Sequence, residues 1–154
     1  MAQLRAKQIW NTALISAVFL VCIDRFLKAV SIIYWQEYPQ NILNGLSLVF
    51  IKNSFIAFSL NTFFQPLLFI IPAITFLLFY FFYLLKNQRL LEASALFFIL
   101  GGAFSNVYDR LLYGFVIDYF DLKYFTIFNV ADVMICGGII LLLWQIIQEQ
   151  KKLN

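Results

Sequence analysis

The chain has 154 residues, of which 63% are hydrophobic and only 12% are charged, and its mean hydropathy is +0.85. This composition is too apolar for a soluble domain, whose surface must be wetted, so it favours a protein embedded in a lipid bilayer. The net charge of +3 comes without any long basic run, so no nucleic-acid partner is expected.

Four apolar stretches are long enough to cross the hydrocarbon core of a membrane, which takes about 20 residues in a helix. A short connection precedes the third stretch, and a longer one precedes the fourth. The first stretch is interrupted near its end by Asp24, Arg25 and Lys28. The sequence therefore predicts an all-α membrane protein with four transmembrane helices in a single domain, residues 1–154. The stretches cover about residues 9–33, 66–85, 90–108 and 128–147.

The basic residues predict how the chain is oriented in the membrane. Because Lys and Arg accumulate in cytoplasmic segments, both termini are expected to be cytoplasmic and the opposite ends of the helices to face outward. The tails and the connection at residues 86–89 hold Arg5, Lys7, Lys86, Arg89, Lys151 and Lys152, against Lys52, Arg110 and Lys123 in the other extramembrane segments.

The connection between the first two helices, about residues 36–62, is expected to form a small external β-cradle. Leu46, Leu48 and Phe50 alternate with Ser47, Val49 and Ile51. A break at residues 52–54 precedes a second apolar group at residues 55–58. This alternation is typical of a short hairpin or curved sheet; the alternative is a structured loop resting on lipid headgroups. The later connection, residues 109–128, is rich in aromatic residues and is expected to lie along the membrane interface.

The residues able to do chemistry gather at one membrane face, because successive spans cross in alternating directions. The chain contains no histidine, which excludes Ser/His/Asp triads, Cys/His dyads and the common His-bearing metal sites. Cys22 and Cys136 lie far apart and without CxxC spacing, so no metal centre or disulfide framework is expected.

Some of these charged residues have a plausible structural role. Asp24 and Lys28 are four residues apart and can form an ion pair on one face of a helix, and this role is favoured over catalysis for both. Asp109 and Arg110 could form a second ion pair at a helix end, with Asn106 on the same face.

Asp118 and Asp132 are left without an obvious cationic partner. Two carboxyl groups brought together share a proton, so one can activate water while the other polarises a carbonyl, as in aspartic peptidases. Asp132 lies about one turn into the helix expected to begin near Asn129, where the helix dipole favours the ionised form, so Asp118 is expected to keep the proton. Intramembrane acids also serve as proton relays, and a small proton-coupled transporter is the alternative.

Two sequence blocks resemble those of the bacterial lipoprotein signal peptidases, also called signal peptidase II. Residues 101–120, GGAFSNVYDRLLYGFVIDYF, are similar to the family block GGA-x-GN-x-x-DR-x-x-x-G-x-V-x-DF. Residues 128–138, FNVADVMICGG, are similar to FN-x-AD-x-x-I-x-x-G. Weaker matches are Asp24 with Lys28, similar to D-x-x-x-K, and Asn53 with Ala57-Phe58, similar to N-x-G-A-A-F. The resemblance covers essentially the whole chain.

The resemblance implies the same four helices with an external β-cradle, and it implies an activity. The family cleaves diacylglyceryl-modified prolipoproteins just before the lipidated cysteine, in the bacterial cytoplasmic membrane, without a cofactor. Its catalytic aspartates fall on Asp118 and Asp132, at the outer membrane face. The positions expected to support them or to bind substrate are Asn106, Arg110, Asn129, Asp24, Lys28, Asn53 and Asp109.

The chain departs from the family pattern at a few positions. Phe55 and Ile56 stand where Gly and Ala are usual, Ser105 stands for Gly, and Leu27 stands for Thr. The bulk at Phe55 and Ile56 is expected to narrow the cradle, so Phe55→Gly is expected to broaden substrate acceptance. An inactive relative that binds lipidated peptides without cutting them is the third alternative.

Overall fold

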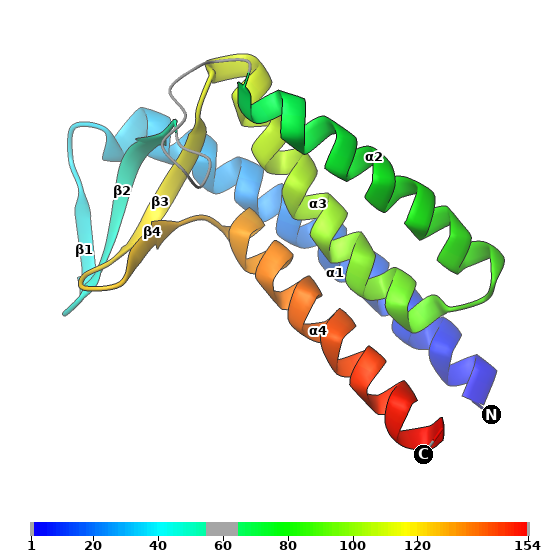
Figure 1. Cartoon of the computed structure of the whole chain (residues 1–154). Coiled ribbons are helices and arrows are strands. Elements are labelled where there is room, and N and C mark those ends of the chain that lie inside the picture. The colour runs from blue at the N-terminus through cyan, green and yellow to red at the C-terminus, as the bar shows by residue number, and fades with distance from the viewer. Residues whose placement is uncertain (1, 55–64, 154) are drawn as a thin grey trace.

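The computed structural model describes residues 2–54 and 65–153, so Phe55, Ile56 and the Ala57-Phe58 match lie outside the described residues. The helices form a bundle that carries a sheet at one end, and both termini lie at the other end (Figure 1). The helices are α1 (Ala2–Val30), α2 (Gln65–Lys86), α3 (Leu90–Tyr113) and α4 (Val130–Leu153), and a π-helical turn, η1 (Ser31–Trp35), continues α1. The strands are β1 (Gln40–Leu43), β2 (Leu46–Asn53), β3 (Val116–Leu122) and β4 (Thr126–Phe128).

Three of the helices in the described residues are long and apolar enough to cross a membrane. They are the segments Leu67–Lys86, Leu90–Tyr113 and Val130–Lys151, which confirms three of the four predicted spans. α1 is not among these three segments. Its 29 residues give it a length of about 44 Å, so the fourth span remains a prediction.

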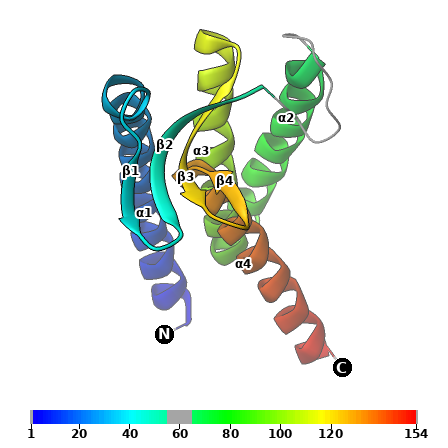
Figure 2. The ribbon, with the colours of Figure 1, turned by 90° about the vertical axis from the view of Figure 1, so that its left-hand side faces the viewer.

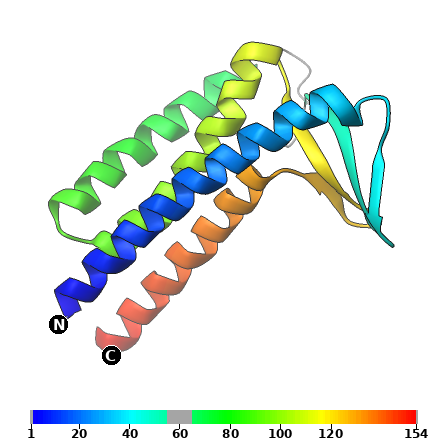
Figure 3. The ribbon, with the colours of Figure 1, turned by 180° about the vertical axis from the view of Figure 1, so that it is seen from behind.

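α3 is the central helix of the bundle and packs against each of the other three. Seen from behind, α1 lies across α3 beside α4 (Figure 3). α3 and α4 approach each other closely at Gly102, because a Cβ atom there would lie only 2.3 Å from the backbone oxygen of Ala131. Small residues permit such close helix contacts in membranes. Gly102 lies one turn before Asn106, and Ala131 precedes Asp132, so this contact brings Asn106 and Asp132 together.

The sheet is antiparallel in the order β1-β2-β3-β4 and lies in front of the helix ends (Figure 2). Leu43 pairs with Leu46 across a two-residue turn, in which Gly45 has a φ of +101°, a conformation that glycine adopts without strain. Ile51 pairs with Asp118, and Asn53 pairs with Val116. The register therefore places Asn53 diagonally beside Asp118.

The predicted β-structure is confirmed for the described part of the first connection, but one detail of the prediction is wrong. β2 continues through Lys52 and Asn53 instead of breaking there. Half of the sheet comes from the α3–α4 connection, for which no strand was predicted. The first residues of β3, Val116 to Tyr119, are all buried. A strand covered on both faces shows no polar-apolar alternation, so its sequence lacks the usual strand pattern.

Candidate active site

Asp132 is fixed at the start of α4 by reciprocal hydrogen bonds with Asn129. The Asp132 backbone N–H donates to Oδ1 of Asn129 at 2.8 Å, and the Asn129 backbone N–H donates to Oδ2 of Asp132 at 3.2 Å. This is a capping box, with Asn129 as the N-cap and Asp132 three residues later. Asp132 therefore lies in the first turn of α4, at the positive end of the helix dipole.

Asp118 lies on β3 with only 2% of its surface exposed. Its Oδ1 accepts a hydrogen bond from the side-chain amide of Asn129 at 2.6 Å. Its Oδ2 accepts one from the side-chain amide of Asn53 at 2.8 Å. β2, β3 and the start of α4 together therefore hold this carboxyl group in place.

Asn129 and Asn106 connect the two carboxyl groups. The Asn129 amide donates to Asp118 and also to Oδ1 of Asn106, at 3.2 Å. The Asn106 amide in turn donates to Oδ1 of Asp132 at 2.8 Å. Asp118 and Asp132 are thus the two ends of one short hydrogen-bonded chain, although they come from β3 and α4.

A buried ionic cluster contacts this hydrogen-bonded chain of side chains through Asn106. Lys28 and Asp24 are both fully buried and form an ion pair at 3.0 Å, which confirms the predicted pairing. The Lys28 ammonium also contacts Oδ2 of Asp109 at 2.7 Å and donates to Oδ1 of Asn106 at 2.9 Å. All three donors of Lys28 are therefore satisfied, and the lysine links α1 to the amide that holds Asp132.

Asp109 does not pair with Arg110, so that predicted ion pair is wrong. Asp109 instead binds Arg25 and Lys28 of α1, because adjacent residues on a helix point in different directions. Arg110 donates to the backbone oxygen of Asn106 at 3.4 Å. Its positive charge acts most strongly on Asp132 and then on Asp118.

Two hydroxyl groups clamp the carboxylate of Asp24. Ser105 donates to Oδ2 of Asp24 at 2.6 Å, and Tyr119 donates to Oδ1 at 2.9 Å. The Tyr119 oxygen also accepts the backbone N–H of Val130 at 3.0 Å, and Asp24 accepts that of Ala131 at 3.1 Å. These contacts satisfy N–H groups of the first turn of α4 that have no partner within the helix.

Removal of the Tyr119 hydroxyl is therefore expected to destabilise the fold. Tyr119→Phe deprives the buried Asp24 carboxylate of a donor and Val130 of an acceptor, which should lower the free energy of unfolding by about 1.5–3 kcal/mol. Thermal unfolding in detergent micelles measures the change. Tyr124→Phe, on the same hairpin and 93% exposed, is the matched control and should change little. Equal stability of the two variants would contradict the clamp.

Burial raises the pKa of Asp118 to about 6, from its usual value near 3.8. The hydrogen bond from Asn53 opposes this rise, and the negative charge of Asp132 adds to it. The neutral form of Asp118 is therefore favoured, in the direction expected from the sequence. The unfolded chain ionises this group near pH 4, so the group disfavours the folded state increasingly as pH rises from about 4 to 6.

The pKa of Asp118 is directly measurable by ¹³C NMR of aspartate-labelled protein. We expect its carboxyl resonance to titrate near pH 6 in the parent chain. In Asp132→Asn the midpoint should move to lower pH, because the neighbouring charge is gone. The unchanged buried surroundings of Asp118 should still hold it above the ordinary value. An unmoved midpoint would show that the two carboxyl groups do not interact.

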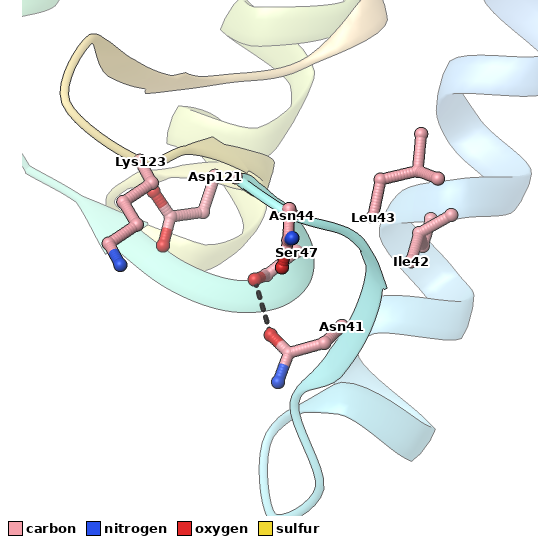
Figure 4. Close-up of a pocket in the computed structure, with 8 residues that line it drawn as sticks. Asn41, Ile42, Leu43, Asn44, Ser47, Asp121 and Lys123 are labelled. Atoms are coloured by element: carbon pink, nitrogen blue, oxygen red, sulfur yellow. Dashed lines mark hydrogen bonds between the residues drawn. The ribbon is translucent and has the colours of Figure 1, made fainter.

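A separate polar hollow of about 680 Å³ lies between the ends of the two hairpins (Figure 4). Asp121 and Lys123 of the β3–β4 hairpin lie along it, and Ser47 donates to Oδ1 of Asn41 at 2.7 Å. Asp121 is the one acid among its lining residues. This hollow therefore has no second carboxyl group with which an acid pair could form.

The structure brings together all of the predicted site residues, since Asp24, Lys28, Asn53 and the others join one network at the sheet end. The sequence reasoning missed Arg25, Ser105 and Tyr119 as members of it. Ser105 had a signal, because it departs from the glycine of the family block. Among the described residues, no three Cys, Asp or Glu side chains are placed to hold a metal ion.

Two solved structures, each described as a bacterial membrane enzyme solved by the in meso method, share this fold. The first has a TM-score of 0.78 and 23% sequence identity, over 94% of this chain and 92% of that chain. The second has a TM-score of 0.74 and 24% identity, over 88% of this chain and 92% of that chain.

Sequence comparison gives the family. The lipoprotein signal peptidase of Caldicellulosiruptor bescii is 35% identical over 82% of this chain and 85% of its own length. That of Syntrophomonas wolfei is 33% identical, over 89% and 94%, and that of Haemophilus influenzae is 32% identical, over 90% and 86%. The family described as Signal peptidase (SPase) II matches residues 16–148. The chain therefore belongs to the signal peptidase II family of lipoprotein-processing membrane peptidases.

Proposed function

We propose that the chain is an aspartic endopeptidase that removes signal peptides from diacylglyceryl-modified prolipoproteins. It cuts the peptide bond just before the lipidated cysteine, and the whole chain acts as one catalytic domain. The observation that carries the proposal is the pair of carboxyl groups, Asp118 and Asp132, joined through Asn129 and Asn106. The reaction as proposed uses water and these two groups, without a cofactor.

The different surroundings of the two acids assign their roles. Asp132, in the first turn of α4, takes a proton from water as the water oxygen attacks the scissile carbonyl. Asp118 is the buried acid with the raised pKa, and it gives its proton to the carbonyl oxygen. The tetrahedral intermediate collapses when Asp132 passes its proton to the leaving amine and Asp118 recovers its own. Both carboxyl groups then return to their starting states.

The remaining polar residues position this pair and the substrate. Asn53 holds Asp118, and Asn106 holds Asp132. Arg110 supplies positive charge near both acids, where it can stabilise the charge that develops on the substrate carbonyl. Asp24, Lys28 and Asp109 form the buried cluster beneath them and act by positioning.

The proposed orientation follows from the charges at the two ends of the bundle. Both termini lie at the same end (Figure 1), where the basic tails favour the cytoplasmic side of the inner membrane. α1 would be the fourth span, and the sheet and the acids would then face outward. Membrane lipids surround the bundle, and the prolipoprotein reaches the site from within the bilayer.

The transporter alternative predicts acids spread through the depth of the membrane. The structure instead gathers Asp24, Asp109, Asp118 and Asp132 in one network at the sheet end. Glu92 and Glu149 lie on α3 and α4 near the termini, where Arg89 pairs with both. α2 carries no Asp or Glu. It therefore offers no acidic side chain that could relay a proton between these two groups.

The function is tested with the purified full chain in liposomes. A diacylglyceryl-modified prolipoprotein and the same precursor with an unmodified cysteine are the two substrates. We expect rapid cleavage of the lipidated precursor only. Equal cleavage of both would refute the substrate assignment, binding without cleavage would favour the inactive relative, and proton flux without cleavage would favour the transporter.

A further inference from the structure

An apolar groove of about 420 Å³ runs along α4 beneath the β3–β4 hairpin. This hairpin lies in front of the first turns of α4 when the sheet faces the viewer (Figure 2). The strands of the hairpin contribute Leu122 and Phe128, and α4 contributes Val133, Cys136, Gly137 and Ile140.

The groove begins at a carboxyl group of the proposed catalytic pair. Asp132 belongs to its lining, and Cys136 and Ile140 follow at intervals of one helical turn, so the groove extends about 12 Å away from Asp132 along the helix. At Gly137 a Cβ atom would meet nothing within 4 Å. The groove is thus open at its centre, in contrast to the tightly packed glycine contacts between α3 and α4.

This side of α4 faces away from α3. Ala131 and Met134 are buried at 0% and 2% exposure, whereas Val133 and Ile140 are exposed at 53% and 67%. The groove therefore opens to the lipid around the bundle while its first turn adjoins the reacting groups. Three other hollows of the described residues have neither Asp118 nor Asp132 in their linings.

The chemistry of the proposed substrate requires such a groove. The scissile bond directly precedes the cysteine, so the thioether-linked glyceryl group starts within one residue of the reacting carbonyl. Its acyl chains must leave the site over apolar surface that is continuous with the acid pair. We propose that the groove from Asp132 to Ile140 holds one acyl chain of the lipidated cysteine. This proposal rests on the proposed function and deepens it.

The groove is expected to position the lipidated cysteine of the substrate, and not to add to its binding by hydrophobic attraction. Lipid tails are as apolar as the groove, so an acyl chain gains little hydrophobic free energy by moving into it from the bilayer. A chain held along α4 instead fixes the lipidated cysteine relative to the two carboxyl groups, and small errors in that placement cost large factors in rate. The groove is therefore expected to act on kcat/KM for lipidated substrates.

The two cysteines of the chain provide a matched test, because both are exposed and only Cys136 lines the groove. Cys22→Ala leaves Cys136 as the one thiol, and Cys136→Ala leaves Cys22. Each variant in liposomes is labelled with dodecyl methanethiosulfonate, with and without a diacylglyceryl-cysteine peptide. At ten times its Kd, the lipidated peptide should slow labelling of Cys136 about tenfold and leave that of Cys22 unchanged.

Two controls identify the occupant of the groove. The unlipidated peptide and added phospholipid should not protect Cys136; protection by either one to the same degree would overturn the proposal, as would no protection by the lipidated peptide. Cleavage of the precursor without protection of Cys136 would refute the groove and leave the peptidase function. Protection in a chain that does not cleave would refute the function and leave the groove.

A blocked groove should also slow cleavage. A dodecyl group attached at Cys136 should lower kcat/KM for the lipidated precursor at least about tenfold, and a reductant that releases it should restore the rate. A dodecyl group at Cys22 should have little effect. Equal inhibition from both cysteines would contradict the proposed site.

Discussion

Asp118→Asn and Asp132→Asn are each expected to lower the rate of prolipoprotein cleavage by at least about a thousandfold. Removal of a general acid or base costs typically 10²–10⁴ in rate, and here the charge of Asp132 also helps to keep Asp118 protonated. Asparagine keeps the size of the side chain and an oxygen that can accept a hydrogen bond. Both variants should therefore remain folded, and rates of cleavage in liposomes measure the loss.

Asp121→Asn is the matched control for these variants, because Asp121 lies on the same strand as Asp118 and pairs with Ser47 and Ile127 at the far part of the sheet. This variant should keep nearly the full rate. Circular dichroism and thermal unfolding of all three proteins separate lost chemistry from lost structure. Substantial turnover by either dyad variant would remove that residue from the proposed mechanism.

Lys28→Met is expected to produce the largest loss of stability. The lysine is fully buried and neutralises Asp24 and Asp109 from between them. Breaking a buried ion pair by removing one partner costs about 3–5 kcal/mol, because an uncompensated charge remains buried. Since native proteins are only marginally stable, the variant should unfold at a much lower temperature or fail to accumulate in the membrane.

Two further variants identify the cause of that loss. Lys52→Met removes an exposed lysine of β2 that contacts aromatic rings, so it should cost well under about 1 kcal/mol. Lys28→Met combined with Asp24→Asn should recover part of the lost stability, because one of the stranded charges is removed as well. If the double variant is less stable than Lys28→Met alone, the charge explanation is wrong.

The sequence was most informative about the membrane helices and about the end of the bundle that carries the acids. Uninterrupted apolar runs define α2 and α4 directly, since a helix in lipid must satisfy its own backbone. The alternating direction of the spans then places Asp24, Asp109 and Asp132 at one end without knowledge of the packing. α1 was harder to assign, because the same charges that build the site lower its hydropathy.

The contribution of β3 to the sheet could not be predicted in the same way. Val116, Ile117 and Tyr119 are buried whichever way they point, so the strand shows no alternation. The pairing of β3 with β2 is also a long-range contact that local sequence does not encode. For this reason the contact between Asn53 and Asp118 was visible only as a family resemblance.

The partners of individual charges were also beyond the sequence. The spacing of Asp24 and Lys28 predicted their ion pair correctly, because the two residues belong to one helix. Asp109 pairs with Arg25 and Lys28 and not with its neighbour Arg110. This pairing depends on how α1 packs on α3. Tertiary packing thus decides which of several available cations neutralises a buried acid.

The most direct test of the proposed hydrolysis is the mass spectrum of the products that the purified chain forms from a diacylglyceryl-modified prolipoprotein. We expect a signal peptide that ends at the residue before the cysteine and a mature lipopeptide that begins with the lipidated cysteine. Neither product should form with Asp132→Asn. An intact precursor, a cut at another bond, or the same products from the variant would contradict hydrolysis of that bond by Asp118 and Asp132.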